Sequence, residues 1–210
     1  MFTVVAGGYG QAEIEVRRSR FIGFLAPAST RGSAREIIDE QRRLYPDARH
    51  HCSAYVLASA GATPSTHSSD DGEPSGTAGA PKLEVLLGAG LVDVVAVVTR
   101  YFGGTLLGTG GLVRAYSEAT QAAIGAAPLA RIETLPTFTV QVDLASAGKV
   151  DAEIRQRDWL LEDASWGAQV DLTFSVPTGE EDAVEPFIAA LTRGEGLLRR
   201  GEDRTRHIRL

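Results

Sequence analysis

The sequence predicts an α/β protein of the α+β kind with two domains, residues 1–131 and 132–210. Apolar residues make up 43% of the 210 residues, which is enough for packed cores. Strand-like and helix-like segments alternate along the chain. This pattern begins anew after Pro128 and Pro136, and the acidic excess behind the net charge of −6 lies beyond residue 131. We therefore expect a linker at these prolines.

The composition also indicates the compartment. No apolar run approaches the roughly 18 residues that a membrane span needs, and residues 1–10 lack the basic and apolar regions of a secretory signal. The one cysteine, Cys52, has no second cysteine for an internal disulfide. These observations favour a cytoplasmic protein without a membrane partner. They leave the oligomeric state open.

The first domain is expected to begin with two short strands at residues 13–16 and 21–26. A helix follows them. Ser33 and Glu36 have the spacing of a capping box at its start, and Pro46 ends it.

A third strand, residues 52–58, leads into a loop rich in Gly, Ser, Thr, Pro and Asp that is expected to cover residues 59–79. A loop of this length inside a compact domain is usually functional or disordered. Pro81 is expected to start a short helix that ends at Gly88. Residues 91–99 are nearly all β-branched, which is typical of a strand buried on both faces. A glycine-rich loop, residues 103–111, and a helix over residues 112–126 complete this domain.

The second domain has the element order βαββαβ, which is the ferredoxin-like arrangement. Its expected strands are residues 137–144, the hairpin 159–165 and 169–176 with a turn near Gly167, and a short strand at Leu197 and Leu198. One helix contains Val150 and Ile154, and the other contains Val184, Phe187, Ile188 and Leu191. Thr178 and Glu181 have the spacing of a second capping box, whereas Pro186 suggests that this last helix starts later.

Two segments of the first domain, residues 68–79 and 99–116, carry the residues best suited to binding. The second segment places a strand, a glycine-rich loop and a helix start in succession. Glycines let the backbone approach a ligand, and the first helical turn offers unpaired N–H groups to an anion such as phosphate. The alternative is a tight turn packed against its own domain, since neither the Walker A nor the Gly-x-Gly-x-x-Gly motif is present.

The residues expected to bind an anion or nucleic acid lie in both segments. The preceding strands, 52–58 and 91–99, are expected to be parallel neighbours, which would bring both segments to one sheet edge. The predicted site consists of Asp70, Asp71, Glu73, Thr77, Arg100, Gly103, Gly104, Gly108, Gly110, Gly111 and Arg114.

The carboxylates of Asp70, Asp71 and Glu73 permit two interpretations. They could hold Mg²⁺ or supply a general base. More often, such a cluster caps helices and turns. His50, His51 and Cys52 suggest a metal less well, because neighbours on a strand point to opposite faces and structural zinc needs four convergent ligands.

The arginines and aromatic residues of the second segment also have two interpretations. Arg100 and Arg114 could bind phosphate through guanidinium groups that stay charged. Alternatively, Arg114 pairs with Glu118, and Arg100 pairs with Asp70 or Asp71. Tyr101 and Phe102 could stack on bases, although core aromatics are commoner at the end of a strand.

These segments, together with Ser19-Arg20-Phe21-Ile22 and residues 47–55, resemble the signature of the IMPACT family, in particular its bacterial, YigZ-like branch. The resemblance covers residues 17–126. It implies a first domain of the ribosomal-protein and translation-factor type, followed by a domain similar to the last domain of elongation factor G. It supplies no catalytic residue.

Two functions follow as expectations. The first is a non-enzymatic, translation-linked binding protein that contacts RNA, a ribosome or a translation factor and regulates translation. The alternative is an enzyme for a phosphorylated small molecule, with the acidic loop as a Mg²⁺ or base site and Gly108 to Gly111 holding the phosphate.

Overall fold

The computed structural model describes residues 1–59 and 62–209. The chain divides into two compact units, residues 1–132 with 207–210, and residues 133–206. The first break lies one residue from the predicted boundary, but the end of the chain belongs to the first unit. A three-stranded sheet has the order β1 (Phe2–Val4), β7 (Leu129–Leu135) and β12 (Arg204–Arg209). No helix within the described ranges is both long and apolar enough to cross a membrane.

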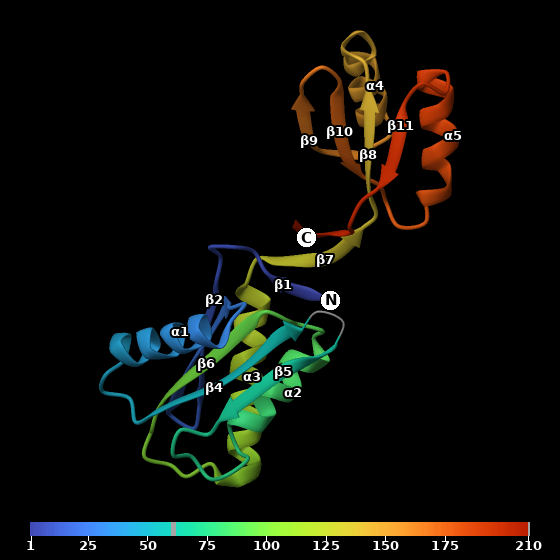
Figure 1. Ribbon diagram of the computed structural model, residues 1–210. Coiled ribbons are helices and arrows are strands. Elements are labelled where there is room, and N and C mark those ends of the chain that lie inside the picture. The colour runs from blue at the N-terminus through green and yellow to red at the C-terminus, as the bar shows by residue number, and fades with distance from the viewer. Residues whose placement is uncertain (60–61, 210) are drawn as a thin grey trace. The chain divides into compact units, whose positions relative to one another are not determined.

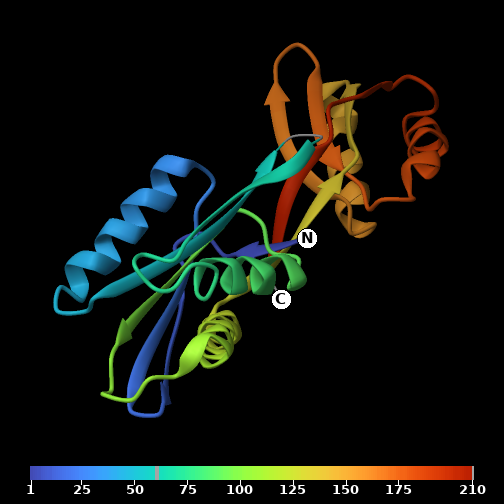
Figure 2. The ribbon, with the colours of Figure 1, turned by 90° about the horizontal axis from the view of Figure 1, so that it is seen from below.

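The first unit is built on a five-stranded sheet (Figure 1). Its strands, in spatial order, are β2 (Gly10–Val16), β3 (Ser19–Pro27), β6 (Val94–Tyr101), β4 (His50–Ser59) and β5 (Ala62–Ser69). Its helices are α1 (Arg31–Leu44), α2 (Gly79–Gly88) and α3 (Gly108–Ala126). Helix α1 lies on one side of the strands, and α2 and α3 lie on the other (Figure 2).

The central strand β6 confirms the prediction of a strand buried on both faces. Val95 and Val97 pack against α1, whereas Val94, Ala96 and Val98 pack on the side of α2 and α3. All five side chains are buried. The β-branched run was therefore a sound indicator, because both faces of this strand need apolar side chains.

Strand β5 corrects the prediction of one loop over residues 59–79. The backbone of residues 62–69 pairs with β4, and residues 60–61 of the predicted loop lie outside the described residues. The sequence of β5 is polar because the strand is at the edge of the sheet, where its side chains need not enter a core. Pro64 is also tolerated at an edge, since an edge strand has N–H positions without a ladder partner.

The prediction that strands 52–58 and 91–99 are parallel neighbours was wrong in their relative direction. Strands β4 and β6 are antiparallel, with Cys52 opposite Val98. The missed strand β5 explains this, because the hairpin of β4 and β5 reverses the chain before α2 crosses over to β6. Strands β5 and β6 therefore both run opposite to β4.

The first helix start also differs from the prediction. Thr30, not Ser33, is the N-cap of α1, and the capping box joins Thr30 to Ser33. The Thr30 Oγ1 accepts a hydrogen bond from the Ser33 N–H at 3.1 Å, and the Thr30 N–H donates to the Ser33 Oγ at 3.2 Å. Two hydroxyl residues three positions apart compete for this role, and the earlier one starts the helix.

The start of α3 also differs from the prediction. This helix starts at Gly108, four residues before the predicted Leu112, so part of the predicted glycine loop is helical.

The second unit confirms the ferredoxin-like prediction. Its elements follow the order β8 (Thr137–Val142), α4 (Leu144–Gln156), β9 (Leu160–Trp166), β10 (Val170–Ser175), α5 (Glu181–Thr192) and β11 (Leu197–Arg200). The antiparallel sheet has the order β11-β8-β10-β9. One core contains side chains of β8, β10 and both helices, among them Val140, Leu172, Ile154 and Ile188.

The start of α5 corrects two predictions. No side chain caps this helix, and the carboxylate of Glu181 accepts a hydrogen bond from the Gly179 N–H instead of forming a box with Thr178. The helix starts at Glu181 despite Pro186 in its interior. Pro186 is exposed, so the carbonyl group that loses its helical partner lies where water can reach it.

The core of the first unit contains one charged side chain that the sequence did not indicate. Lys82 of α2 is fully buried, with its Nζ donating to the Ala78 carbonyl oxygen at 3.0 Å and lying 4.8 Å from the centre of the Tyr116 ring. No ion pair among the described residues involves it. Burial lowers the pKa of Lys82 to about 8, although nearby carboxylates act against this shift.

Replacing Lys82 with methionine should raise the free energy of unfolding at pH 7 by about 1–3 kcal/mol, because methionine fills similar space without a charge to desolvate. In the wild type, the unfolded lysine, with its ordinary pKa of about 10.4, binds more protons than the folded one above about pH 8. Stability should therefore rise from about pH 7.5 to about pH 9. Above about pH 9 a second group acts in the opposite direction. Burial raises the pKa of the Cys52 thiol to about 11, so the unfolded thiol loses its proton at a lower pH than the folded one, and this lowers the stability as pH rises.

Urea unfolding followed by far-UV circular dichroism measures both effects. Tryptophan fluorescence supplies an internal control, since Trp159 and Trp166 both lie in the second unit and should show no such rise. A wild-type stability that is flat over this range would contradict a buried, charged Lys82.

Candidate functional site

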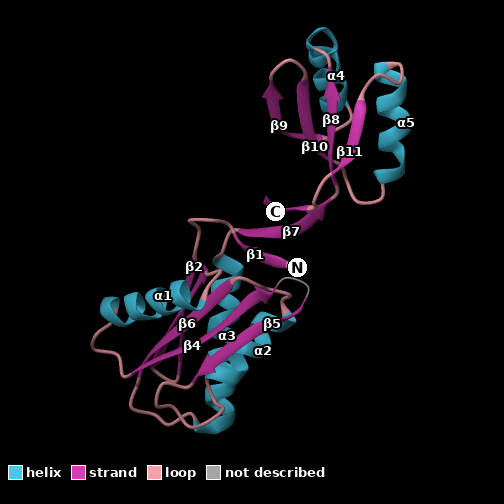
Figure 3. Cartoon of the chain, viewed as in Figure 1, coloured by secondary structure: helices cyan, strands magenta, loops and turns pink. Residues whose placement is uncertain are grey.

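The two predicted segments meet at one end of the sheet of the first unit. Because β5 and β6 both run opposite to β4, their last residues lie at the same end. The loops that follow these strands gather there (Figure 3). Both segments therefore reach one end of the sheet through an antiparallel arrangement. They do not form the single expected site, because Asp71 and Gly110 lie on opposite sides of the strands.

Glu73 joins the two segments. One of its oxygens, Oε1, accepts hydrogen bonds from the Arg100 Nη1 at 2.7 Å and from the Tyr116 hydroxyl at 2.8 Å. The Glu73 and Arg100 side chains are only 3% and 7% exposed. Burial raises the pKa of Tyr116 far above its usual value, so its hydroxyl stays protonated and donates to the carboxylate. The expected partner of Arg100, Asp70 or Asp71, was therefore wrong.

The guanidinium group of Arg100 also lies near two aromatic rings. Its Cζ is 5.4 Å from the centre of the Phe21 ring and 5.7 Å from that of Phe102. Its Nε is buried and has no hydrogen-bond partner. Arg100 therefore acts as a support between the core and Phe102, and its guanidinium group is committed to Glu73.

Asp70 caps a helix, as the second interpretation of the acidic cluster had it. Its Oδ1 accepts from the N–H groups of Ala78 and Gly79 at the start of α2, at 2.9 and 2.8 Å, and its Oδ2 accepts from the Gly76 N–H at 2.8 Å. Burial alone would raise the pKa of Asp70, but these three backbone donors outweigh it and lower the pKa. Thr77 serves the same turn, with its hydroxyl donating to the Pro74 carbonyl oxygen at 2.6 Å.

Asp71 points to the other face of the sheet. Its carboxylate accepts from the Arg42 guanidinium of α1 at 2.9 Å and from the His51 N–H at 2.7 Å. Gly110 lies at the start of α3, on the opposite side of the strands. The carboxylates of Asp70, Asp71 and Glu73 thus serve three separate sets of partners.

The histidines and the cysteine near this cluster are also engaged inside the domain. His50 and His51 contact the carbonyl oxygens of Asp71 and Tyr45 through ring nitrogens, at 2.9 and 3.1 Å. Burial lowers the pKa of His51. The Cys52 thiol lies 3.0 Å from the Asp70 carbonyl oxygen, and its raised pKa keeps it protonated and poorly nucleophilic at neutral pH.

The geometry gives no support to a metal site. Throughout the described part of the chain, no group of three His, Cys, Asp or Glu side chains is placed to hold a metal ion. A magnesium ion at Asp70, Asp71 and Glu73 would have to displace the backbone and arginine donors that already bind these oxygens.

The glycines of the second segment have two different roles. A Cβ on Gly103 would lie 2.0 Å from the carbonyl carbon of Arg18, so Gly103 lets this loop pack against the turn between β2 and β3. Gly104 and Gly108 adopt positive φ angles of 83° and 71°. Gly108, Gly110 and Gly111 begin α3; the first two are exposed and the third is half-buried, so this helix start remains accessible to a ligand.

The structure adds three outward-facing residues to this helix start that the predicted site lacked. Arg17 and Arg18 form the tip of the β2–β3 hairpin, and both are exposed with φ angles of 49° and 65°. Phe102 is 56% exposed, so it is not the core aromatic that its position suggested. The sequence signal was the Arg-Arg pair between two predicted strands.

Arg17 and Arg114 line one small cavity of about 320 Å³ beside the start of α3, together with Gly111, Leu107 and Glu118. Arg114 is exposed and forms no ion pair with Glu118 or any other carboxylate among the described residues. Its predicted alternative partner was therefore wrong. Its role in binding an anion stays a prediction.

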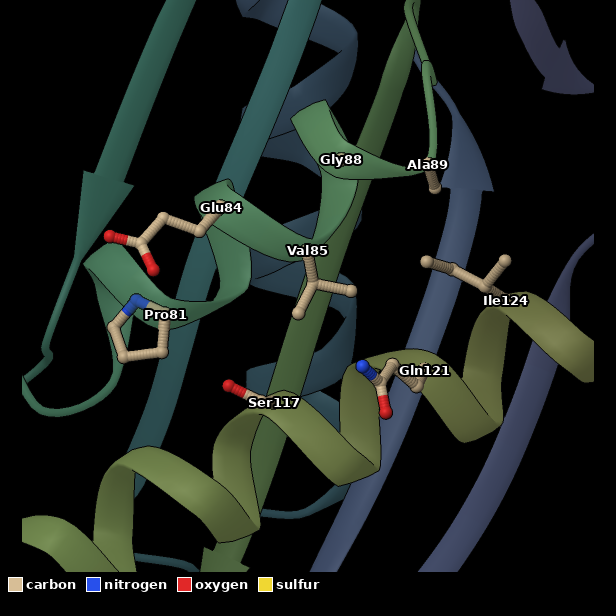
Figure 4. Close-up of a pocket in the computed structure, with 8 residues that line it drawn as sticks. All are labelled: Pro81, Glu84, Val85, Gly88, Ala89, Ser117, Gln121 and Ile124. Atoms are coloured by element: carbon tan, nitrogen blue, oxygen red, sulfur yellow. The ribbon is translucent and has the colours of Figure 1, made fainter.

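A cavity of about 500 Å³ lies elsewhere, between α2 and α3 (Figure 4). Val85 of α2 and Ser117, Gln121 and Ile124 of α3 face into it, and Glu84 is its one charged lining residue. None of the eleven predicted site residues lines this cavity.

Comparison with known proteins agrees with the resemblance seen in the sequence. The model of the Impact N-terminal domain matches residues 17–124, and that of a domain of unknown function, DUF1949, matches residues 140–195. The chain is similar to the IMPACT family member YvyE of Bacillus subtilis (strain 168), with 36% identity over 92% of this chain and 88% of the relative. The IMPACT family member YigZ of Escherichia coli (strain K12) is also 36% identical, over 86% of this chain and 88% of the relative.

A solved crystal structure of a hypothetical protein extends the likeness to the fold. It is 34% identical, superposes with a TM-score of 0.60, and covers 96% of this chain and 97% of its own. Both family models and both relatives agree, and the chain therefore belongs to the IMPACT family.

Proposed function

We propose that this protein is a non-enzymatic binding protein that acts on the translation apparatus. It contacts its partner through Arg17, Arg18, Phe102, Gly108, Gly110, Gly111 and Arg114, which we call the arginine–glycine surface. The proposal is carried by two exposed arginines, Arg17 and Arg114, that line one cavity beside the start of α3, with the exposed Arg18 next to Arg17. None of the three has an ion pair among the described residues.

The neighbouring arginines differ from these three. Arg20 is bound to Glu13, Arg42 to Asp71 and Arg100 to Glu73, all at 2.7–2.9 Å. Unpaired guanidinium groups next to free N–H groups of a helix start favour an anionic partner such as phosphate. This arrangement suits the RNA-rich surface of a ribosome.

The link with translation rests on family membership and on the second unit. The IMPACT resemblance implies a first domain of the translation-factor type and a second domain like the last domain of elongation factor G. The βαββαβ order of the second unit agrees with that expectation. The enzyme alternative loses support, because the side chains that would act as acid, base or nucleophile are held by internal partners.

The triple variant Arg17→Gln, Arg18→Gln, Arg114→Gln should lose most of its binding to purified bacterial ribosomes. In a cosedimentation titration, the slope of log affinity against log salt should become shallower by about three, roughly one for each lost phosphate contact. The matched control Arg35→Gln, Arg43→Gln, Arg49→Gln removes the same charge from other exposed positions. Equal losses in both variants would show only the effect of net charge and would overturn the proposal.

Glu73→Gln tests whether the acidic residue is a support or a reacting group. It should lower the free energy of unfolding by about 2–4 kcal/mol, because Arg100 then remains buried without a countercharge. Combining Glu73→Leu with Arg100→Met should recover much of the loss, since both buried charges are then gone. Glu84→Gln, on the exposed face of α2, is the control and should change nothing. An unchanged melting temperature in Glu73→Gln would contradict the supporting role.

A further inference from the structure

We propose that the partner of the arginine–glycine surface is single-stranded RNA, with one base stacked on Phe102 and the adjoining phosphates bound by Arg17 and Arg18. This inference rests on the proposed function and names the chemistry of its partner. It is carried by an exposed aromatic ring in a loop that packs against a turn made of two arginines.

The Phe102 ring is exposed to solvent and lies beside the buried Arg100 guanidinium. The ring is 56% exposed and lies 5.7 Å from the Arg100 guanidinium, which is fixed in turn by Glu73 at 2.7 Å. A large apolar ring normally turns toward a core, whereas this one packs on a buried cation and leaves much of its surface open. Every base has a π-face, so an exposed aromatic ring suits stacking of unpaired bases.

Arg17 and Arg18 occupy a turn that does not favour their residue type. Both have positive φ angles, 49° and 65°, in a two-residue hairpin turn where Asn-Gly is the usual sequence. Strained backbone of this kind concentrates at functional sites. The two side chains are exposed, and neither forms an ion pair with a described residue.

The two features lie next to each other. Gly103, which follows Phe102, packs so closely on Arg18 that a Cβ would lie 2.0 Å from the Arg18 carbonyl carbon. The Gly103 N–H also donates to the Ser19 Oγ at 3.1 Å. The arginine turn and the loop that carries Phe102 therefore pack directly against each other, so one short RNA strand could contact both.

The charges around the surface favour an anionic strand. Arg114 joins Arg17 in lining the cavity at the start of α3, where Glu118 is the opposing charge. Glu13 is neutralised by Arg20 at 2.8 Å, which leaves Glu15 as the other nearby carboxylate on β2. A duplex presents phosphates but keeps its bases stacked inside, so it cannot use Phe102. An acidic protein could use the arginines without the ring.

The test is fluorescence anisotropy with labelled ten-nucleotide U₁₀ and A₁₀ RNA, and with a blunt RNA duplex as comparison. Phe102→Ala should weaken binding of U₁₀ and A₁₀ by about 5- to 100-fold with little change in the salt slope, and Phe102→Trp should retain it. Arg17→Gln with Arg18→Gln should weaken binding and reduce the salt slope by about two. Trp166→Ala, which removes another exposed ring in the second unit, is the matched control and should have no effect.

Three outcomes would overturn the inference. They are unchanged binding in Phe102→Ala, duplex binding as tight as U₁₀ binding, and no binding of either single strand. If the strands fail to bind while ribosome cosedimentation still depends on Arg17, Arg18 and Arg114, the partner is a protein or a duplex, and the proposed function survives. Loss of the arginine dependence in cosedimentation as well would remove both proposals.

Discussion

The buried contact between Glu73 and Arg100 is the interaction on which the rest of the candidate site depends. It connects the loop after β5 to the end of β6, and through the Tyr116 hydroxyl it also fixes α3. A buried ion pair of this kind adds little net stability compared with apolar side chains, because desolvation offsets the attraction. Removing one partner, however, leaves a charge stranded in the core. The contact therefore acts by fixing one arrangement of two loops, and it holds the Arg100 guanidinium 5.7 Å from the Phe102 ring.

The same two segments contain both the inward-facing scaffold and the outward-facing surface. Asp70 holds the start of α2, Asp71 binds α1, and Glu73 binds β6 and α3, so the acidic loop joins elements from both faces of the sheet. The carboxylates of this loop already accept hydrogen bonds from these elements. The glycines at the start of α3 and the arginines beside them have no such partners, which is why binding is better assigned to them than to the acidic residues.

Patterns that report burial predicted much of the fold. The β-branched run in β6 indicated a strand buried on both faces, and the element order βαββαβ indicated the ferredoxin-like unit. Strand β5 was not predicted because an edge strand needs no apolar pattern, and without it the antiparallel pairing of β4 and β6 could not be seen.

The burial of Lys82 was not predicted because a lysine on a short helix is normally exposed. Its burial depends on tertiary contacts with Ala78 and Tyr116. The eleven predicted residues lie at one end of the sheet, but their inward or outward direction is set by tertiary contacts and not by local sequence.

The acidic excess of the chain lies beyond residue 131, so the first domain has no net charge, but a sum of charges over a domain is a poor guide to its local surface. A surface acts on a ligand through charges within roughly one Debye length, about 8 Å at physiological ionic strength. Arg20, Arg42 and Arg100 each have a carboxylate within 3 Å, so they contribute little to the field beyond their own pairs. Arg17, Arg18 and Arg114 are exposed and have no such partner among the described residues, and Arg17 and Arg114 line the cavity beside the start of α3. Pairing elsewhere in the domain thus leaves a local positive surface on a chain with net negative charge, and that local surface is what an anionic strand would meet.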